Sequence, residues 1–208
     1  MSDAACFVFG AGPFYGLVRS PQPGDCILAA DGGYRHCQAA GLQPDLLMGD
    51  FDSLETLPPG LETRTFPPEK DDTDTMLAVK AGLELGFRTF HLYGGTGGRM
   101  DHTLANLQTL GYLARQGARG YLYDQHTVFT ALWNDRLTLP QRAEGIFSVF
   151  CLGGEATGVS IRGGQYPLDR GTLSPFFPLG VSNHFQGQPV EISVEDGCLL
   201  VSWELAEP

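Results

Sequence analysis

The feature that most constrains this fold is an alternation of short apolar runs with stretches of helical periodicity, which continues to about residue 125. The apolar runs are residues 5–9, 26–30, 46–48, 89–93 and 120–123. This order is typical of βα units that stack on a parallel sheet. We therefore expect an α/β domain over residues 1–130, with a Rossmann-like parallel sheet in a three-layer arrangement.

Three stretches in this part of the chain have the spacing of helices. They are residues 34–40, 75–85 and 103–115, and each is followed by a glycine of the type that ends helices: Gly41, Gly86 and Gly117. The last stretch is the most regular, because leucines recur at every third position. We expect Leu104, Leu107, Leu110 and Leu113 to form one buried stripe.

The pattern changes after residue 135, where glycines recur every 8 to 12 positions and no helical stripe is left. Short apolar segments at 147–151, 159–161, 190–194 and 198–203 predict strands. We therefore expect an all-β domain over residues 131–208, built as an antiparallel sandwich or barrel.

The charge of the chain restricts its partners. The 208 residues include 13 Lys and Arg against 24 Asp and Glu, a formal net charge of −11. Such an acidic chain is a poor partner for nucleic acid or for anionic membranes. If the substrate carries phosphates, a divalent cation is expected between them and the carboxylates.

The absence of targeting patterns and the spacing of the cysteines indicate the compartment in which the protein is expected. No apolar run approaches the roughly 18 residues of a membrane span, and the first residues lack the pattern of a secretory signal, so we expect a soluble, cytoplasmic protein. The cysteines number five and never form a C-x-x-C pair, which fits neither a disulfide framework nor a zinc site. We expect them to be reduced and mostly buried.

Acidic residues gather just after two of the apolar runs. Asp50 and Asp52 follow the run at 46–48, and alternation along an extended strand end lets both carboxylates point to the same side. Paired carboxylates suit Mg²⁺, which binds few carboxylates plus phosphate oxygens. The alternatives are a solvated turn, or the motif of phosphatases with a nucleophilic aspartate, although those carry Thr or Val where this chain has Leu54.

The segment at 70–74 precedes a predicted helix and carries Lys70, Asp71, Asp72, Thr73 and Asp74. Asp72 or Thr73 could simply cap that helix, with Asp74 near its positive end. Two acidic clusters beside one sheet edge nevertheless exceed what capping requires, since open α/β sheets bind ligands at the carboxyl ends of their strands.

A glycine-rich segment at 94–98 lies between the run at 89–93 and the strongest helix. Glycines allow backbone N–H groups to approach a phosphate, and Arg99 adds a fork suited to phosphate oxygens. It is not a Walker A loop, because no Lys-Ser or Lys-Thr follows. The structural alternative is a tight turn without a ligand.

Two other features carry less weight. Gly10-Ala11-Gly12 begins like a dinucleotide-binding fingerprint, but its third glycine comes one residue late, at Gly16, and Pro13 interrupts it. The histidines show no metal-ligand spacing, and only His102 lies beside a candidate site.

Four blocks in order closely resemble the thiamine pyrophosphokinase family. The first block is residues 30–33, and the second is the pair 44–45 together with residues 49–53. The third is residues 70–74, in which the residue at 72 is not part of the motif, and the fourth is residues 97–102, in which the residue at 100 is not. The similarity continues at Ser182-Asn183. The resemblance implies transfer of the diphosphoryl group of ATP to the hydroxyethyl oxygen of thiamine, giving thiamine diphosphate and AMP. It also implies a nucleotide-binding catalytic α/β domain, a thiamine-binding β domain, and a homodimer with active sites between subunits.

The same resemblance assigns roles to residues. Those expected to hold Mg²⁺ are Asp50, Asp52 and Asp74. Those expected to bind ATP are Asp31, Gly32, Gly33, Lys70, Thr73, Gly97, Gly98, Arg99 and His102, with Asp101 in the same loop. Ser182 and Asn183 are the expected thiamine contacts.

Two assignments stay open. Asp71 or Asp101 could accept the proton of the thiamine hydroxyl. Some family members stack thiamine on a tryptophan, at a position we align with Val201; Trp203 lies on the same strand face and could replace it, as could Tyr166 or Phe185. The alternative functions are a phosphohydrolase or a diphosphotransferase for another small alcohol using the same carboxylates, and a noncatalytic thiamine or nucleotide sensor.

Overall fold

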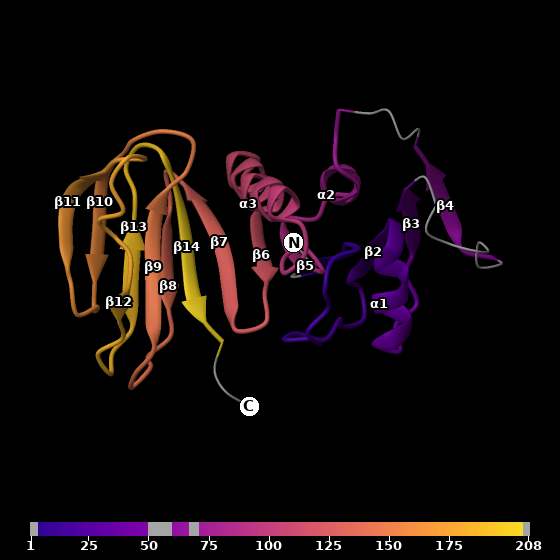
Figure 1. Cartoon of the computed structure of the whole chain (residues 1–208), viewed down its shortest axis with the longest axis horizontal. Coiled ribbons are helices and arrows are strands. Elements are labelled where there is room, and N and C mark those ends of the chain that lie inside the picture. Colours follow the sequence, from indigo (N-terminus) through magenta and orange to yellow (C-terminus); the bar gives the residue numbers. More distant parts are fainter. Residues whose placement is uncertain (1–3, 50–59, 67–70, 206–208) are drawn as a thin grey trace. The chain divides into compact units, whose positions relative to one another are not determined.

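The computed structural model describes residues 4–49, 60–66 and 71–205. The chain divides into two compact units, one comprising Met1–Thr109 with Gly120–Gln125 and the other comprising Leu110–Arg119 with His126–Pro208. The strands around β1 in the first unit pair in parallel, whereas those of the second unit pair antiparallel (Figure 1).

The first unit is organised around strands in the order β6-β5-β1-β2-β3-β4. β1 pairs in parallel with both β2 and β5, and the parallel pairing continues from β2 to β3 and from β3 to β4. The elements are β1 (Cys6–Phe9), β2 (Cys26–Ala30), the 3-10 helix η1 (Asp31–Gly33), α1 (Tyr34–Ala39), β3 (Leu46–Gly49), β4 (Glu62–Thr65), α2 (Asp74–Glu84), β5 (Thr89–Tyr93), α3 (Met100–Arg115) and β6 (Arg119–Tyr123).

Helices cover this sheet on both faces. At Gly82 of α2 a Cβ atom would lie 2.6 Å from Phe90 Cε1 and 2.8 Å from Cys6 Sγ, so α2 packs tightly on the face that carries Cys6. On the opposite face, Phe14 joins Phe9 to His36 of α1, with ring centroids 6.0 and 5.3 Å apart. Because side chains alternate along a strand, Cys6 and Phe9 belong to opposite faces. The sheet therefore lies between two helix-bearing layers.

The second unit consists of antiparallel strands in two sheets. Their orders are β12-β9-β14-β7 and β11-β10-β13-β8. The strands are β7 (Thr127–Trp133), β8 (Arg136–Leu139), β9 (Ile146–Cys151), β10 (Ala156–Arg162), β11 (Leu168–Leu173), β12 (Asn183–His184), β13 (Val190–Ser193) and β14 (Cys198–Glu204).

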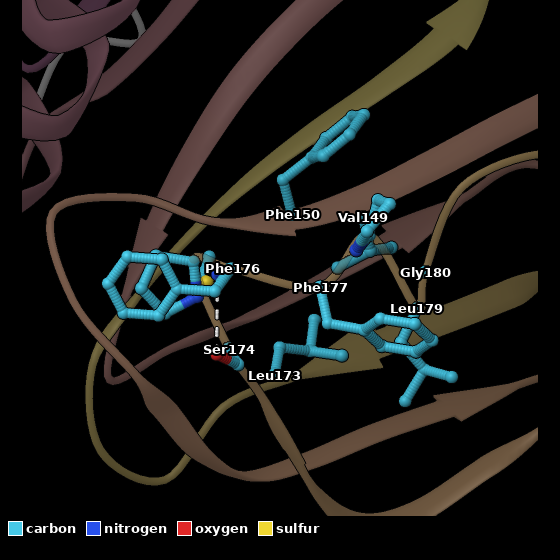
Figure 2. A pocket seen from close by; sticks show the side chains of 11 residues that line it. Val149, Phe150, Leu173, Ser174, Phe176, Phe177, Leu179 and Gly180 are labelled. Atoms are coloured by element: carbon cyan, nitrogen blue, oxygen red, sulfur yellow. Dashed lines mark hydrogen bonds between the residues drawn. The ribbon is translucent and has the colours of Figure 1, made fainter.

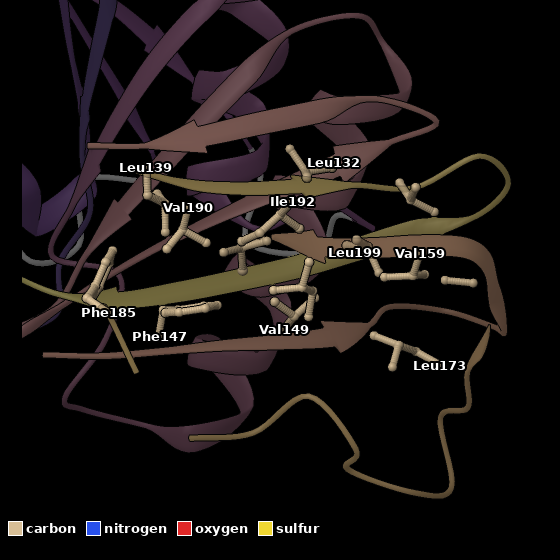
Figure 3. Close-up of a cluster of buried hydrophobic side chains, with 14 residues drawn as sticks. Leu132, Leu139, Phe147, Val149, Val159, Leu173, Phe185, Val190, Ile192 and Leu199 are labelled. Atoms are coloured by element: carbon tan, nitrogen blue, oxygen red, sulfur yellow. The ribbon is translucent and has the colours of Figure 1, made fainter. Parts of the chain in front are cut away.

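The core of the second unit lies between these two sheets (Figure 3). Phe147, Val149 and Leu199 come from one sheet, and Val159 and Ile192 come from the other; all five are at most 2% exposed. The inward-facing residues of the two sheets form such a core, although β14 is buried continuously from Cys198 to Val201. Of the two expected forms, sandwich and barrel, the chain adopts the sandwich.

One expectation about α3 is wrong. Leu104 is 56% exposed, whereas Leu110 and Leu113 are fully buried. A step of three residues falls short of one helical turn, so each leucine is displaced by about 60° from the previous one. The three steps from Leu104 to Leu113 therefore pass from the solvent side to the core, and the stripe is buried only at its carboxyl end.

The other sequence expectations concern cysteines and membranes. All five cysteines are free thiols, and four of them are buried. Within the described residues, no helix has the length and apolar character that a membrane crossing requires.

Candidate functional site

The carboxyl ends of the parallel strands in the first unit meet at one edge of the sheet. Gly10 follows β1, Asp31 follows β2, β3 ends at Gly49, and Gly94 follows β5. These strands are paired in register, so the segments that leave them are neighbours. This is the edge at which open α/β sheets bind ligands.

Two glycine loops are bound to each other at this edge. Gly10 N donates to Tyr93 O at 2.8 Å, and Gly12 N donates to Gly94 O at 2.8 Å. Gly94 has a φ of +65°, and a Cβ atom there would lie 2.3 Å from Gly10 O, so no other residue fits without moving the backbone. The loop after β1 and the glycine-rich loop after β5 therefore form one wall.

This wall borders a hollow of about 340 Å³. Its lining comes from the β1 loop, the β5 loop, the first turn of α2 and the first turns of α3: Ala11, Gly12, Pro13, Thr75, Gly94, Gly95, Thr96, Gly98, Arg99, His102, Thr103 and Asn106. Such a volume is at the lower end of the range for small-molecule sites.

Two side chains fix the glycine-rich loop from behind. Asn106, which is buried, donates from Nδ2 to Gly95 O at 2.8 Å. Thr96 Oγ1 donates to Asp124 Oδ1 at 2.5 Å. A loop held in this way presents its outer residues, Gly97 and Gly98, in a defined conformation.

Arg99 and Asp101 form an exposed ion pair at the start of α3. Arg99 donates from Nη2 to Asp101 Oδ2 at 2.6 Å and from Nε to Oδ1 at 3.2 Å, and His102 N also donates to Oδ1. The hydrogen bonds from Arg99 hold the pKa of Asp101 below its usual value, and the carboxylate raises the pKa of Arg99. Asp101 is therefore ionised at neutral pH, and Arg99 is a cation at the edge of the hollow.

Thr73 is the N-cap of α2, because its Oγ1 accepts a hydrogen bond from Met76 N at 3.2 Å. Asp72 accepts from Lys80 Nζ at 2.6 Å. Asp71 is exposed, and Asp74 is half-buried in the first helical turn. The capping interpretation of this segment thus holds for Thr73, while Asp71 and Asp74 lie beside the positive end of α2.

Close packing determines where Asp31 lies. Its φ of +49° is in the left-handed region, which few residues other than glycine adopt. A Cβ atom at Gly49 would lie 3.2 Å from Asp31 Cα, and one at Gly33 would lie 1.9 Å from Phe9 O. Strain of this kind persists only where the surrounding structure imposes it.

The expected magnesium ligands are only partly within the described structure. Asp50, Asp52 and Lys70 lie outside the described residues, while Asp74 is at the start of α2. Within residues 4–49, 60–66 and 71–205, no three His, Cys, Asp or Glu side chains gather closely enough to hold a metal ion.

The residues expected to bind thiamine are all in the second unit. Ser182 is exposed, with a φ of +57°, and Asn183 is buried in β12. Trp203 is half-buried and packs against the sandwich core on the same strand face as Val201, which is fully buried. The apolar segment 173–180 precedes Ser182. Together with Val149, Phe150 and Cys151, this segment lines a hollow of about 170 Å³ (Figure 2).

Some lining residues were not among the sequence candidates. Ala11, Gly12 and Pro13 belong to the segment that we set aside as an incomplete dinucleotide fingerprint, and Thr75 and Asn106 carried no signal. The strand order would have indicated the first three, because β1 and β5 are adjacent and their loops must meet. Asn106 could be found only from its contact with Gly95.

Two family models match the chain. Residues 22–122 match the model described as "Thiamin pyrophosphokinase, catalytic domain", and residues 136–199 match "Thiamin pyrophosphokinase, vitamin B1 binding domain". Together these ranges cover most of the chain. The first contains most of the strand edge described above, and the second contains Ser182 and Asn183.

Individual relatives agree with this match. A thiamine pyrophosphokinase of Bacillus subtilis is 39% identical over 79 residues, which is 34% of this chain and 36% of the relative. The crystal structure of thiamine pyrophosphokinase from Bacillus subtilis has a TM-score of 0.88 at 22% identity, covering 98% of this chain and 100% of that one. A thiamin pyrophosphokinase family protein from Enterococcus faecalis has a TM-score of 0.79 at 25% identity, covering 99% and 100%.

Proposed function

Because the chain belongs to the thiamine pyrophosphokinase family, we propose that it transfers the diphosphoryl group of ATP to the hydroxyethyl oxygen of thiamine, giving thiamine diphosphate and AMP. The observation that carries this proposal is the match of a catalytic model and a vitamin B1 binding model, in that order, to the two parts of one chain. The hollow at the sheet edge of the first unit supports it independently.

The reaction forms one bond and breaks one bond. The thiamine hydroxyl oxygen attacks the β-phosphorus of ATP, and the bond from that phosphorus to the α,β-bridging oxygen breaks. AMP leaves with the bridging oxygen, and the hydroxyl proton is released. Phosphoryl transfer asks little covalent chemistry of a protein, so the chain contributes mainly by positioning and by stabilising charge.

For the nucleotide, we assign the residues around the strand edge: Asp31, Gly32, Gly33, Lys70, Thr73, Gly97, Gly98, Arg99 and His102. Gly98, Arg99 and His102 line the hollow, which supports their part in this set. The ion pair of Arg99 with Asp101 is exposed, and exposed ion pairs are weak. A triphosphate can therefore replace Asp101 as the partner of Arg99 at little cost.

For the cation, we assign Asp50, Asp52 and Asp74 as the residues that would hold Mg²⁺. The donor set fits this ion because it consists of carboxylate oxygens: Asp50 and Asp52 come directly after β3, which ends beside Asp31, and Asp74 begins α2. When bound, Mg²⁺ supplies positive charge to the diphosphate and to the leaving oxygen.

A carboxylate near the nucleotide would take the hydroxyl proton, and Asp71 and Asp101 are the two that we propose. The lowered pKa of Asp101 makes it a weak base while Arg99 stays bound to it. Departure of Arg99 to a phosphate would remove that effect. The same substrate would thus both engage Arg99 and strengthen Asp101 as a base.

For thiamine, we assign a site in the second unit that is built from the region of Ser182, Asn183 and Trp203. We also propose that the protein is a cytoplasmic homodimer with its active sites between subunits. The apolar side chains exposed on the segment before Ser182 support a partner surface, since Phe176 is 94% and Phe177 is 65% exposed.

The test is a product analysis of the purified protein with ATP, Mg²⁺ and thiamine. We expect AMP and thiamine diphosphate to form in equal amounts, and neither to form without thiamine. Formation of ADP would refute diphosphoryl transfer, and release of phosphate independent of thiamine would favour the phosphohydrolase alternative. Thiamine binding without any product would indicate a sensor.

A further inference from the structure

The side-chain amide of Asn183 is hydrogen-bonded to backbone groups of Tyr166 and His184. Its Oδ1 accepts hydrogen bonds from Tyr166 N at 3.0 Å and from His184 N at 2.9 Å, and its Nδ2 donates to Tyr166 O at 2.7 Å. The residue is 3% exposed. An amide oxygen accepts two hydrogen bonds, so this one has no acceptor capacity left for a ligand.

The turn that Asn183 holds is fixed at other points too. Gln165 N donates to His184 O at 3.0 Å, and Gly164 forms a bridge with Phe185. At Gly164 a Cβ atom would lie 2.8 Å from Asn183 Oδ1, so the amide is packed directly against the turn. Residues 164–167 therefore have their conformation set by the segment 183–185.

The neighbouring residue, Ser182, differs from Asn183 in its exposure and in the hydrogen bonding of its side chain. Ser182 is exposed, and its hydroxyl makes no hydrogen bond within the described part of the chain. Its backbone N donates to Ser148 Oγ at 3.0 Å, which anchors the main chain and leaves the side chain available. Of the two adjacent residues, only Ser182 is arranged to contact a ligand.

The turn held by Asn183 carries an aromatic ring at the surface. Tyr166 is 58% exposed, and it borders a hollow of about 130 Å³ whose other walls include Pro167, Leu168, Leu179 and Val181. An apolar cavity of about this size accommodates one six-membered aromatic ring. Asn183 also borders this hollow, with its amide oxygen and one amide N–H already bonded to the turn.

We propose that Asn183 is a positioning residue for thiamine and not a contact: it fixes the turn at 164–167 so that the ring of Tyr166 forms one wall of the site for an aromatic ring of the substrate. This inference rests on the proposed function. It assigns the direct contacts to Ser182 and Tyr166, and it makes the effect of Asn183 depend on Tyr166.

The experiment is a double-mutant cycle with Asn183→Ala and Tyr166→Ala, measured as the KM for thiamine. Each single variant is expected to raise that KM about tenfold, the scale of one aromatic contact, with the KM for ATP unchanged. The double variant is expected to match the single variants, since the amide acts through the ring. Tyr166→Phe, which keeps the ring, is expected to restore the KM of the unaltered protein.

Hydrogen exchange gives a measurement that does not depend on activity. In Asn183→Ala, the peptide containing Tyr166 is expected to exchange faster while the strands of the sandwich keep their protection. The matched control is Asn134→Gly, which removes a comparable bond, from Gly197 N to Asn134 Oδ1 at 2.8 Å, and tolerates the φ of +48° at that position. It should change neither the KM for thiamine nor the exchange of this peptide.

Three results would overturn the inference. The first is an unchanged KM for thiamine in Tyr166→Ala, whose exposed side chain can be removed without unfolding the domain. The second is full additivity in the double variant, which would show that Asn183 contacts thiamine by itself. The third is unchanged exchange at Tyr166 in Asn183→Ala. Absence of thiamine diphosphate in the unaltered protein would instead refute the proposed function, and the exchange measurement would still test the turn.

Discussion

The substitution Gly98→Ala is expected to affect the stability of the fold and the binding of ATP in opposite directions. Gly98 does not have a left-handed φ, and a Cβ atom there would meet only Pro13 Cδ, at an ordinary contact distance of 3.5 Å. Gly98→Ala should therefore fold normally and gain about 0.4–1 kcal/mol, because alanine restricts the unfolded chain. The fold alone does not explain a glycine at this position.

A phosphate beside the loop would make the same methyl group costly. If backbone N–H groups of this loop approach the triphosphate, the methyl group displaces at least one charge-assisted hydrogen bond, which contributes about 1.5–3 kcal/mol. We therefore expect the KM for ATP to rise between about 10-fold and 100-fold in Gly98→Ala. The KM for thiamine should stay within about twofold, because the change is confined to the nucleotide loop.

The assay is AMP formation at varied ATP, together with urea unfolding of the ligand-free protein. Gly154→Ala is the matched control, since Gly154 has open space around it, a φ outside the left-handed region and a place in the second unit. Gly97→Ala is expected to differ from both, because Gly97 has a φ of +76° and alanine there costs about 1–2 kcal/mol of stability. An unchanged KM for ATP in Gly98→Ala would refute the phosphate role of the loop.

Three further predictions concern stability and turnover. Gly33→Ala should lower the free energy of unfolding by about 3 kcal/mol or more, measured in urea, because its Cβ would lie 1.9 Å from Phe9 O; a loss below about 0.5 kcal/mol would show that the backbone yields easily. Burial lowers the pKa of His91 to about 4 from 6.5, so the unfolded chain binds a proton that the folded chain does not, and the free energy of unfolding should fall by about 3 kcal/mol between pH 6.5 and pH 4. His91→Gln should flatten that part of the pH profile, and an equal slope in both proteins would assign it to another group. Asp74→Asn should lower kcat by about 100-fold in a protein that stays folded, and near-normal turnover would remove it from the proposed cation site.

The sequence predicted the buried strands and the helices of the first unit well. The range 26–30 is β2, 89–93 is β5, and 75–85 differs from α2 by one residue at each end. These elements are bounded by glycines and polar turns, and their apolar runs are continuous because both faces of the sheet are covered. Local pattern and tertiary burial agree in such segments.

Strands without an apolar pattern were missed. β4 (Glu62–Thr65) is exposed along its whole length, and β12 (Asn183–His184) consists of two polar residues. Both lie at the end of a sheet, where backbone pairing with one neighbour defines the strand and side-chain burial does not. Hydropathy carries no signal for pairing of that kind.

In the candidate site, too, the sequence predicted some features and missed others. Motifs close in sequence identified the segments that meet at the strand edge, because parallel strands bring their carboxyl ends together. The role of Asn106 depends on one hydrogen bond to Gly95, 11 residues away, and the role of Asn183 depends on two hydrogen bonds to Tyr166, 17 residues away; spacing encodes neither. A motif thus identifies a residue near the site, and the hydrogen bonds of its side chain show whether that side chain is available to a ligand or holds the backbone.

The most direct test of the proposed reaction follows one oxygen atom. ATP carrying ¹⁸O in the α,β-bridging position is incubated with the protein, Mg²⁺ and thiamine, and the products are examined by ³¹P NMR and mass spectrometry. Attack at the β-phosphorus predicts that all of the label leaves in the phosphate of AMP and that thiamine diphosphate contains none. Label in the thiamine product, or in ADP, would contradict the transfer of an intact diphosphoryl group.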